Sequence, residues 1–357
     1  MPDILAQDLD AALERTRDLW SELTGCRLLL TGATGFIGTL LLESVAHARA
    51  RAGVDVGVVA LVRNLDRLHV RRPWTRTAAW LEIVQGDARS FAVPAGTLDL
   101  AIHAASTGSP AELAADPAGI AHLVVEGSRH VRDVAGAAGA RRLLHLSSGS
   151  VYGPHHAPAP PIVEEDQGQP QGSDRASRLA RAKREAEQAL LAPGASDALD
   201  IVIARGFALC GPWLPTDYAF AFGNFVGAAV RGEPIRVSGD GTPVRSYLYA
   251  SDLIVWLWTL LLRGRHARPY NVGSEHPISI GDLARRVAAQ CGGAVEMGAS
   301  PVSGTAADWY VPSTARARTE LGLRETVPIG PAIARTVRWW TEHEPRSSFR
   351  ATGVDKP

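Results

Sequence analysis

Lys183 is the residue of this chain whose chemistry stands out first. It lies in SRLARAKREAEQ (177–188), and apart from Lys183 and Lys356 every basic residue is an arginine. A lysine offers a compact ammonium with an adjustable pKa, which an arginine guanidinium does not replace. Retention of Lys183 in so arginine-rich a chain therefore predicts a chemical role, the alternative being chance placement on a solvated helix face.

A glycine-rich turn occurs early in the chain, in LLLTGATGFIG (28–38). A predicted strand is followed by Gly32, Gly35 and Gly38, with a predicted helix beginning near Phe36. Glycines at such a turn let the backbone approach a pyrophosphate, which then sits against the unpaired N–H groups of the helix start. Because the turn follows the first strand of an α/β pattern, it predicts a dinucleotide site rather than a plain strand-to-helix connection. The predicted contacts are Gly32, Thr34, Gly35, Phe36, Ile37 and Gly38.

The end of the second predicted strand bears on the choice between NAD and NADP. In ALVRN (60–64), Val62 and Arg63 stand where an acidic side chain would bind the ribose 2′-hydroxyl of NAD. Arg63 suits the 2′-phosphate of NADP, but it is equally well explained as a solvated loop residue. Asp87 in QGDA is expected either to hydrogen-bond the adenine or to cap the following turn. The predicted cofactor is therefore NAD or NADP.

The composition favours a small-molecule partner. Of the 357 residues, 37 are basic and 37 acidic, 46% are hydrophobic, and the pI is about 7.2. This balance argues against nucleic acid or a membrane surface as partner. Cys26, Cys210 and Cys291 lie far apart without a CxxC motif, which indicates a cytoplasmic protein, and no HxxxH or HExxH spacing indicates a metal site. The longest apolar run, 253–262, covers about half of a membrane span.

Short apolar runs alternate with helical patterns along the first part of the chain. The expected strands are RLLLTG (27–32), VGVVALV (56–62), LEIVQGD (81–87), LDLAIHAA (98–105), RRLLHLSS (141–148) and LDIVIARGFAL (199–209). Continuous apolar strands that alternate with helices indicate a parallel sheet covered on both faces. The predicted class is α/β, a Rossmann-like doubly wound parallel sheet with a smaller C-terminal substrate-binding lobe.

The predicted organisation has four parts and one long loop. The parts are an N-terminal helical extension (1–26), a dinucleotide-binding domain (27–205, with a returning segment near 246–275), a substrate-binding lobe (206–245 and 276–343) and a flexible tail (344–357). Residues 154–176 are rich in Pro and Gln and lack periodicity, so they are expected to form the loop.

Several motifs follow one another in an order that a known family shares. They are TGATGFIG, GDA, HAAS, LSSGSVYG, the Lys183 helix, GFALCGP, GDGTPVRSYLYASDL and YNVGS, between about Arg27 and Gly322. In this order the chain resembles the extended short-chain dehydrogenase/reductase family, in its nucleotide-sugar epimerase/dehydratase branch. The resemblance implies that Asp87, Ala88, Ala104 and Lys183 contact the cofactor. It also implies a nucleotide-diphosphate sugar as substrate and a homodimer formed through a bundle that includes the lysine-bearing helix.

The resemblance also implies which residues are catalytic. In that family a Ser or Thr acts with a Tyr-x-x-x-Lys helix: the tyrosine exchanges a proton with a sugar hydroxyl while nicotinamide exchanges a hydride with the same carbon. The lysine lowers the pKa of the tyrosine and holds the nicotinamide ribose. Ser148 matches the Ser/Thr and Lys183 the lysine, but Leu179 occupies the tyrosine position. Leucine transfers no proton.

Two further departures affect the expected reaction and substrate contacts. Family 4,6-dehydratases carry an acid pair where this chain has Gly149 and Ser150, so ordinary 4,6-dehydration is not expected. Ala208 replaces an asparagine whose amide commonly contacts the substrate diphosphate. Arg245, in RSYLY, remains as a diphosphate clamp. The expected substrate contacts are Ser148, Ser150, Asn224 and Arg245.

If the chain is an active enzyme, another residue or water must carry the proton. Tyr152 is one candidate, although a structural role is common for it in this motif. An unperturbed histidine titrates in a suitable range, which makes His155 and His156 candidates, but they are also explained as exposed loop residues. Lys183 itself would serve if burial lowered its pKa.

Three functions remain open at this point. The first is an NAD(P)-dependent nucleotide-sugar epimerase or oxidoreductase with a non-standard proton carrier. The second is a catalytically impaired homologue that binds dinucleotide or nucleotide sugar, and the third is an enzyme of the same fold with a non-sugar substrate. Retention of Ser148, Lys183 and the glycine turn favours the first function, whereas loss of the tyrosine favours the second.

Overall fold

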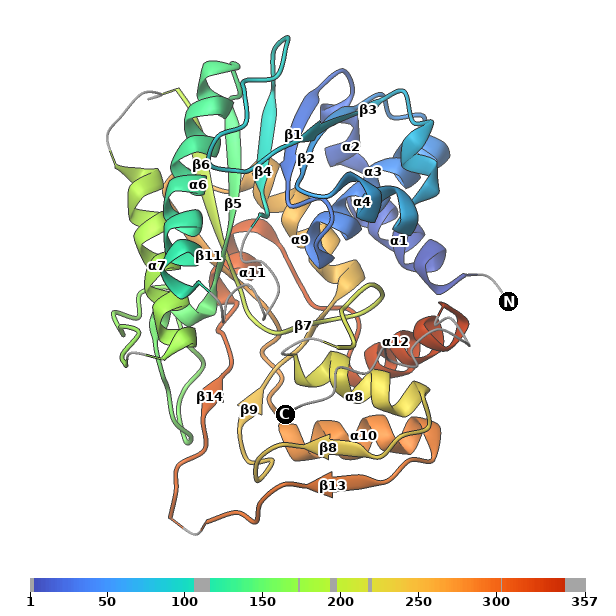
Figure 1. Ribbon diagram of the computed structural model, residues 1–357, viewed down its shortest axis with the longest axis vertical. Helices are drawn as coiled ribbons and strands as arrows, with labels where there is room; N and C mark the ends of the chain where they lie inside the picture. Colours follow the sequence, from blue (N-terminus) through green and yellow to red (C-terminus); the bar gives the residue numbers. More distant parts are fainter. Residues whose placement is uncertain are drawn as a thin grey trace, which may run out of the picture.

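Seven parallel strands form the central sheet of the computed structural model (Figure 1). The structure describes residues 3–105, 116–172, 174–192, 198–217, 220–302 and 304–343. The strands are β1 (Arg27–Thr31), β2 (Gly57–Val62), β3 (Leu81–Gln85), β4 (Leu100–His103), β5 (Arg142–Ser148), β6 (Asp200–Gly206) and β11 (Pro269–Val272). Their order is β11-β6-β5-β4-β1-β2-β3, and every neighbouring pair is parallel. The predicted Rossmann-like α/β class is confirmed.

The strand order reverses at β1, which fixes where a ligand can bind. The chain places β2 and β3 on one side of β1, then returns to place β4, β5 and β6 on the other side. In doubly wound folds such a reversal leaves a crevice at the carboxyl ends of the two central strands. Here those strands are β1 and β4, whose last paired residues are Thr31 and His103.

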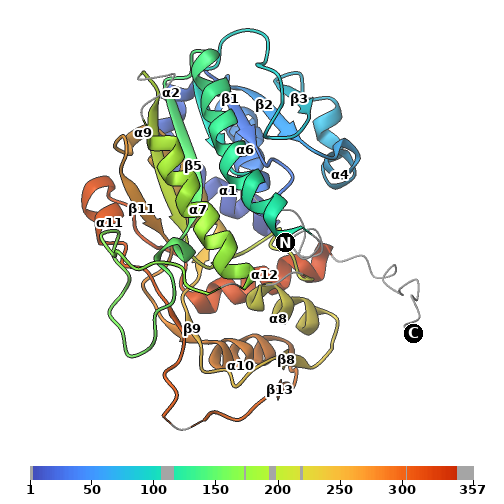
Figure 2. The same ribbon diagram turned by 60° about the vertical axis from the view of Figure 1, so that its left-hand side comes forward.

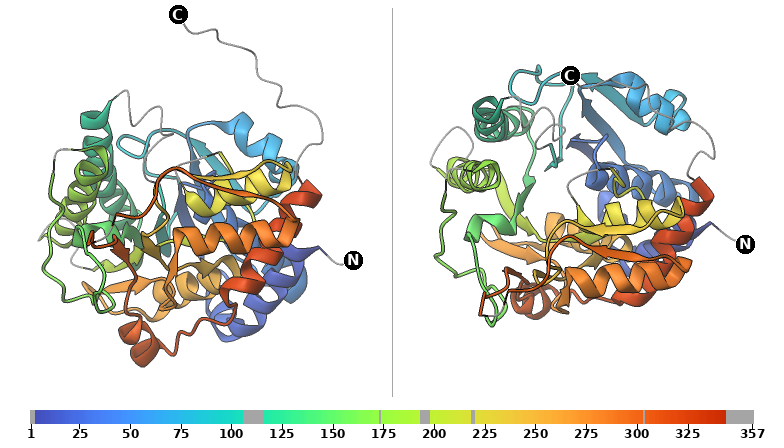
Figure 3. Two further views of the ribbon diagram at one scale, coloured as in Figure 1. Left: turned by 90° about the horizontal axis from the view of Figure 1, so that it is seen from below. Right: turned by 60° about the horizontal axis from the view of Figure 1, so that its bottom comes forward.

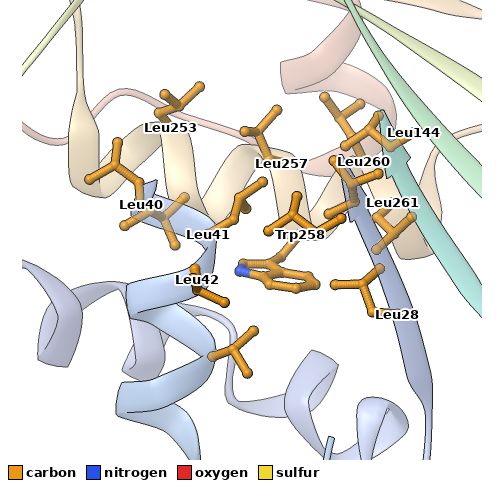
Figure 4. Close-up of a cluster of buried hydrophobic side chains, with 14 of the residues drawn as sticks. Leu28, Leu40, Leu41, Leu42, Leu144, Leu253, Leu257, Trp258, Leu260 and Leu261 are labelled. Atoms are coloured by element: carbon orange, nitrogen blue, oxygen red, sulfur yellow. The ribbon is translucent and has the colours of Figure 1, made fainter. Parts of the chain in front are cut away.

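One face of the sheet is covered by α3 (Phe36–Ala52) and α9 (Ala250–Arg263). Outside these helices, α1 (Ile4–Arg15) packs on both of them and α2 (Arg17–Leu23) packs on α9. The long apolar run of the sequence lies in α9, which is buried almost all round. Figure 4 shows Trp258 of this helix among leucines of α3, α9 and the sheet. The indole N–H of Trp258 donates to Ser44 Oγ (2.9 Å), so its one polar atom is satisfied within the core. Of the helices described, none is both long and apolar enough to cross a membrane.

Two long helices, α6 (Pro117–Ala137) and α7 (Arg175–Leu191), run side by side over the opposite face (Figure 2). Small side chains allow this close approach, because Ala182 and Ala186 of α7 pack against Val124 and Val125 of α6. The α7 helix carries Lys183, and its packing against the sheet sets the depth of that side chain.

A smaller lobe lies beyond the carboxyl edge of the sheet. Its helices are α8 (Ala221–Val230), α10 (Ile280–Cys291) and α12 (Ile329–His343), seen from below in Figure 3 in yellow, orange and red. Its short strands are β7 (Leu209–Cys210), β8 (Ile235–Val237), β9 (Val244–Arg245), β10 (Leu248–Tyr249), β12 (Ile278–Ser279), β13 (Val295–Met297) and β14 (Trp309–Tyr310). Strand β9 lies between β12 and β14, so β14 is held at the edge of the lobe that faces the sheet.

The remaining described segments are short helices and loops between these elements. They include the short helices α4 (Leu65–Arg71), η1 (Pro73–Arg76), η2 (Gly149–Tyr152) and α11 (Ala315–Leu321). The expected loop 154–176 holds bridges from His156 to Asp308 and from Ile162 to Pro312. These bridges tie the loop to the chain around β14. The expected flexible tail, 344–357, lies outside the described residues.

Candidate active site

A cleft lies at the carboxyl edge of the sheet, with walls from both the sheet domain and the lobe. The sequence-predicted residues that line it are Gly32, Thr34, Gly35, Phe36, Ile37, Gly38, Arg63, Ala88, Ala104, Ser148, Asn224 and Arg245. Asp87, Ser150, Tyr152 and Lys183 are not among its lining residues. The fold thus brings the predicted cofactor contacts and the predicted substrate contacts into one space.

The glycine turn between β1 and α3 forms the floor of one end of the cleft. Gly32 has a φ of 74°, and a Cβ on it would lie 2.6 Å from the backbone carbonyl of Ala104. A Cβ on Gly38 would overlap the carbonyl oxygen of Gly32. Gly35 caps α3 without a side-chain hydrogen bond, so the first amides of the helix point at the cleft without a side-chain partner. This arrangement fits a dinucleotide pyrophosphate.

The ends of β2 and β3 supply the wall beside this turn. Arg63 follows β2 and lines the cleft together with Arg67 and Arg71. The Asp87 carboxylate is held by Arg89 through bonds of 2.9 and 2.8 Å, and these bonds lower the pKa of Asp87. Asp87 is therefore ionised and turned toward Arg89, and the charge at the cleft wall is basic.

Lys183 lies buried near the carboxyl end of β5. Its side chain is 6% exposed, and Nζ donates to the carbonyl oxygen of Leu146 (3.2 Å), two residues before Ser148. Burial lowers the pKa of Lys183 to about 8, opposed by the charge of Glu187 one turn further along α7. The ammonium therefore keeps its charge at neutral pH and brings a positive potential to the end of β5.

Leu179 lies one turn before Lys183 and belongs to an apolar contact between helices. It packs against the cluster that Ala182 and Ala186 form with Val124 and Val125 of α6. Leu179 does not line the cleft. Its position adds no polar group to the site, as expected for a leucine.

Tyr310 of the lobe lies next to Ser148 in the cleft. The Tyr310 hydroxyl lies 3.4 Å from Ser148 Oγ and 3.4 Å from the carbonyl oxygen of Gly206, and both side chains line the cleft. The Tyr310 ring packs on Phe207 with centroids 4.5 Å apart, which fixes its direction. Burial raises the pKa of Tyr310 to about 12, opposed by its bond with Ser148 and by the charge of Arg245.

Tyr152 is placed in the interior, away from the cleft. It is 1% exposed; its hydroxyl donates to Asn271 Oδ1 (2.7 Å) and accepts from Arg205 Nη1 (2.9 Å). Burial raises the pKa of Tyr152 above its usual value. These bonds link β6, β11 and the turn after β5, so the geometry argues against the sequence-based choice of Tyr152 as proton carrier. His155 is paired with Asp166 (2.9 Å) in the long loop.

Two buried histidines lie in one row across the sheet. His103 of β4 and His145 of β5 are register partners with ring centroids 5.3 Å apart. His103 is hydrogen-bonded to Thr31 Oγ1 (2.7 Å) and Ser128 Oγ (3.2 Å), whereas neither ring nitrogen of His145 has a partner among the described residues. Burial, together with the Lys183 charge, lowers the pKa of His103 to about 3, so its ring is neutral. Across the described ranges, no group of three His, Cys, Asp or Glu could hold a metal ion.

The lobe contributes polar side chains to the substrate end of the cleft. Arg245 of β9 pairs with Asp308 (2.5 Å) and lies over the Tyr310 ring, with Cζ 5.7 Å from its centroid. Asn224 is exposed on the first turns of α8. Ser150 acts through its backbone, because its N–H donates to Ser148 Oγ (3.2 Å).

Tyr310 is the residue that the sequence did not single out. It lies 162 positions after Ser148, and its strand has two residues, too few to show a periodicity. No local motif marks the tyrosine in DWYVPS, since its proximity to Ser148 arises only from the pairing of β14 with β9.

Comparison with known proteins identifies similar chains that act on nucleotide sugars. UDP-glucuronic acid decarboxylase 2 of Arabidopsis thaliana is 29% identical over 266 residues, covering 74% of this chain and 56% of the relative. UDP-glucuronic acid decarboxylase 1 of Xenopus tropicalis is 25% identical over 92% of this chain and 76% of its own. The chain thus spans about half the length of the first of these relatives.

The same comparison with solved structures supports the fold. The dTDP-glucose 4,6-dehydratase of Streptomyces venezuelae, solved with NAD bound, superposes with a TM-score of 0.74 at 24% identity, over 89% of this chain and 97% of its own. The model of the NAD dependent epimerase/dehydratase family matches residues 28–273. This match extends from the glycine turn through the end of β11 and covers more than half of the chain. The protein therefore belongs to the NAD-dependent epimerase/dehydratase family.

Proposed function

We propose that this protein is an NAD(P)-dependent nucleotide-sugar epimerase or oxidoreductase that acts at a sugar carbon by hydride transfer. The observation that carries the proposal is the single cleft that joins the glycine turn to Ser148 and Arg245. Membership of an NAD-dependent family supports the cofactor, and the UDP-glucuronic acid decarboxylase activity of the relatives supports a nucleotide sugar as substrate.

The glycine turn would hold the cofactor. The backbone from Gly32 to Gly38 leaves room for a pyrophosphate, and the N-terminal amides of α3 supply donors to its oxygens. When bound there, the nicotinamide dinucleotide supplies a site that accepts or donates a hydride. Ala88 and Ala104 form the walls of this end of the cleft. Lys183 has two ammonium hydrogens beyond the one given to Leu146, and we assign them to cofactor hydroxyl groups at the end of β5.

The opposite end would hold the nucleotide sugar. Arg245 offers a planar guanidinium suited to a diphosphate, and Asn224 offers an amide on the facing helix. Ser148 lies between the two ends, where its hydroxyl can hydrogen-bond the reacting oxygen of the sugar. Gly149 and Ser150 provide no carboxyl group beside it, so we do not propose 4,6-dehydration.

Turnover of nucleotide sugars tests the proposed function. The purified protein is incubated with NAD⁺, NADP⁺ or their reduced forms and a panel of UDP- and dTDP-linked sugars, and products are separated by chromatography and identified by mass. Conversion without a net change in cofactor absorbance indicates an epimerase, and consumption of reduced cofactor indicates a reductase. Dinucleotide binding without conversion of any sugar would contradict the proposal in favour of a binding protein.

Two neighbouring serines of β5 provide a matched pair of variants. Ser148 lines the cleft, whereas the next residue back, Ser147, faces the other side and has a buried hydroxyl without a partner in the described residues. We expect Ser148→Ala to lower kcat about tenfold or more and Ser147→Ala to leave it unchanged. Equal kcat values for the two variants would contradict a catalytic role for Ser148.

A binding-only function is the second candidate, and a specific residue favours it. By the motif resemblance, Leu179 takes the place of the family's proton-transferring tyrosine, and it packs in the α6–α7 contact. A third reading, the same fold acting on a non-sugar substrate, would show as cofactor turnover with ketones or alcohols that carry no nucleotide.

We also propose a cytoplasmic homodimer. The three cysteines are free thiols, two of them buried, as expected for a reducing compartment. The α6 and α7 helices lie side by side on one flank, the place where the resemblance implies a four-helix contact with a second copy (Figures 1 and 2). Light scattering after size-exclusion chromatography tests this, and a monomer mass at micromolar concentration would contradict the dimer.

A further inference from the structure

The proposed hydride transfer requires a proton partner at the reacting oxygen. When a hydride joins a ketone carbon, the carbonyl oxygen gains a negative charge that must be met by a proton. The residue that supplies it must reach that oxygen directly or through one water. Leu179 has no such group, and Tyr152 has its hydroxyl enclosed by Asn271 and Arg205.

Tyr310 brings a hydroxyl to the required place. Its oxygen lies 3.4 Å from Ser148 Oγ, and both residues line the cleft. A sugar oxygen that accepts a hydrogen bond from Ser148 would therefore lie within reach of the Tyr310 hydroxyl. Packing against Phe207 holds the ring, and the pairing of β14 with β9 holds its backbone.

We propose that Tyr310 is the catalytic proton carrier of this protein, in place of the tyrosine that position 179 lacks. This inference rests on the proposed nucleotide-sugar function and names the group that completes its site. The proton therefore enters from the lobe side of the cleft instead of from α7.

The step balances as follows in the direction of reduction. Held at the glycine turn, a reduced nicotinamide dinucleotide would supply the hydride that forms a C–H bond at the keto carbon, and the carbonyl π electrons would move to oxygen. The Tyr310 O–H bond breaks, and its proton forms the new hydroxyl of the sugar. The tyrosine phenolate then takes a proton from water, and the reverse sequence oxidises the alcohol.

The surroundings of Tyr310 suit both forms of this side chain. The protonated hydroxyl donates to the carbonyl oxygen of Gly206 (3.4 Å). After proton transfer, the Ser148 hydroxyl can turn to donate to the phenolate, and the Arg245 guanidinium adds an attractive charge. Burial nevertheless raises the pKa of Tyr310 to about 12, so the residue is protonated at neutral pH and is poised to donate.

The test compares Tyr310→Phe with Tyr270→Phe. Tyr270 is a matched control, because its hydroxyl is bonded to Glu320 (2.9 Å) and it does not line the cleft. With the nucleotide sugar that the wild type converts, we expect Tyr310→Phe to lower kcat about 10²–10⁴-fold with little change in KM or in cofactor affinity. We expect Tyr270→Phe to retain the wild-type kcat. Tyr310→Phe with a kcat within about twofold of wild type would overturn the inference.

A second readout is independent of turnover. Tyrosinate absorbance is titrated with pH for wild type and Tyr310→Phe, each saturated with NAD⁺ or with NADH, and the difference curve gives the ionisation of Tyr310. Oxidised nicotinamide carries a positive charge, so a phenol beside it should ionise at lower pH with NAD⁺ than with NADH. The same ionisation with both would overturn the placement of Tyr310 at the reacting carbon.

The two proposals fail in different ways. Wild-type protein that converts no nucleotide sugar, but shows the NAD⁺-dependent ionisation, contradicts the proposed function and leaves Tyr310 beside the nicotinamide. Wild-type conversion that survives Tyr310→Phe contradicts only the assignment of Tyr310.

Discussion

The two ends of the cleft are built in different ways. The glycine turn at one end lies in a contiguous stretch, in which β1, the turn and α3 follow one another from Arg27 to Ala52. The substrate end joins Ser148 of β5 to Tyr310 and Arg245 of the lobe, segments separated by as many as 162 residues. The glycine turn depends on local backbone geometry. The grouping of Ser148 with Tyr310 and Arg245 depends on the pairing of the lobe strands. The sequence predicts the glycine turn but not the approach of Tyr310 to Ser148.

The largest loss of dinucleotide binding and stability is expected from substitution in the glycine turn. Gly32→Ala places a Cβ against the backbone of Ala104 at a φ of 74°, so we expect loss of dinucleotide binding and a free energy of unfolding lower by about 1–3 kcal/mol. Gly25→Ala is the matched control, because Gly25 has a φ of 80° with no neighbouring atom within 4 Å. Binding is measured by calorimetric titration with NAD⁺. Equal losses of binding and stability in both variants would mean that strain at a positive φ, and not contact with the Ala104 backbone, explains the effect.

The buried Lys183 should affect the pH dependence of stability. Burial holds the pKa of Lys183 near 8 against a usual 10.5, so between these pH values the unfolded chain binds more protons than the folded chain. Stability of the wild type should therefore rise with pH through this window, by roughly 3 kcal/mol relative to Lys183→Met. Urea unfolding of both proteins at pH 7 to 10.5 measures the difference. Parallel pH dependences would contradict a buried, charged lysine.

A tyrosine at position 179 of α7 tests whether a proton carrier on that helix can replace Tyr310. In a Tyr310→Phe background, Leu179→Tyr returns a hydroxyl one turn before Lys183. We expect kcat to recover about tenfold over Tyr310→Phe alone, because the ammonium of Lys183 would then act on a neighbouring phenol. Leu179→Phe in the same background adds the ring without the hydroxyl and should not recover activity. Recovery with phenylalanine would show that ring packing explains the gain.

The smallest effect is expected at the basic wall of the cofactor end. Arg63 is exposed and lines the cleft, so Arg63→Ala should weaken NADP binding relative to NAD by about 1 kcal/mol, roughly fivefold. Arg76→Ala, on η1 and outside the cleft, controls for the loss of one surface charge. Titrations of both dinucleotides at two salt concentrations measure the ratio. An unchanged ratio of NADP to NAD affinity would show that Arg63 does not contact the 2′-phosphate.

The sequence predicts the parts of this molecule that are encoded locally. Apolar runs such as 141–148 and 199–209 give β5 and β6, and the glycine turn appears between β1 and α3 where its pattern places it. The run 199–209 also contains β7, a separate two-residue strand that pairs with β10 in the lobe. The boundary between the two strands could not be read from hydrophobicity, because Phe207 and Ala208 continue the apolar run.

The rest of the site depends on contacts that no short pattern records. Tyr310 reaches Ser148 through a two-residue strand, and Tyr152 is held away from the cleft by Asn271 and Arg205 from two other strands. The row of His103 and His145 beside Lys183 likewise follows from strand register and not from spacing along the chain. Each of these placements is a property of strand pairing, which sequence periodicity within one segment does not determine.

The most direct test of the central claim is mass spectrometry of the small molecules released when freshly purified protein is denatured, followed by titration of the emptied protein with NAD⁺ and NADP⁺. We expect a nicotinamide dinucleotide, either released in stoichiometric amount or bound on titration with loss of binding in Gly32→Ala. Absence of any released dinucleotide together with no binding of either form would contradict a nicotinamide enzyme.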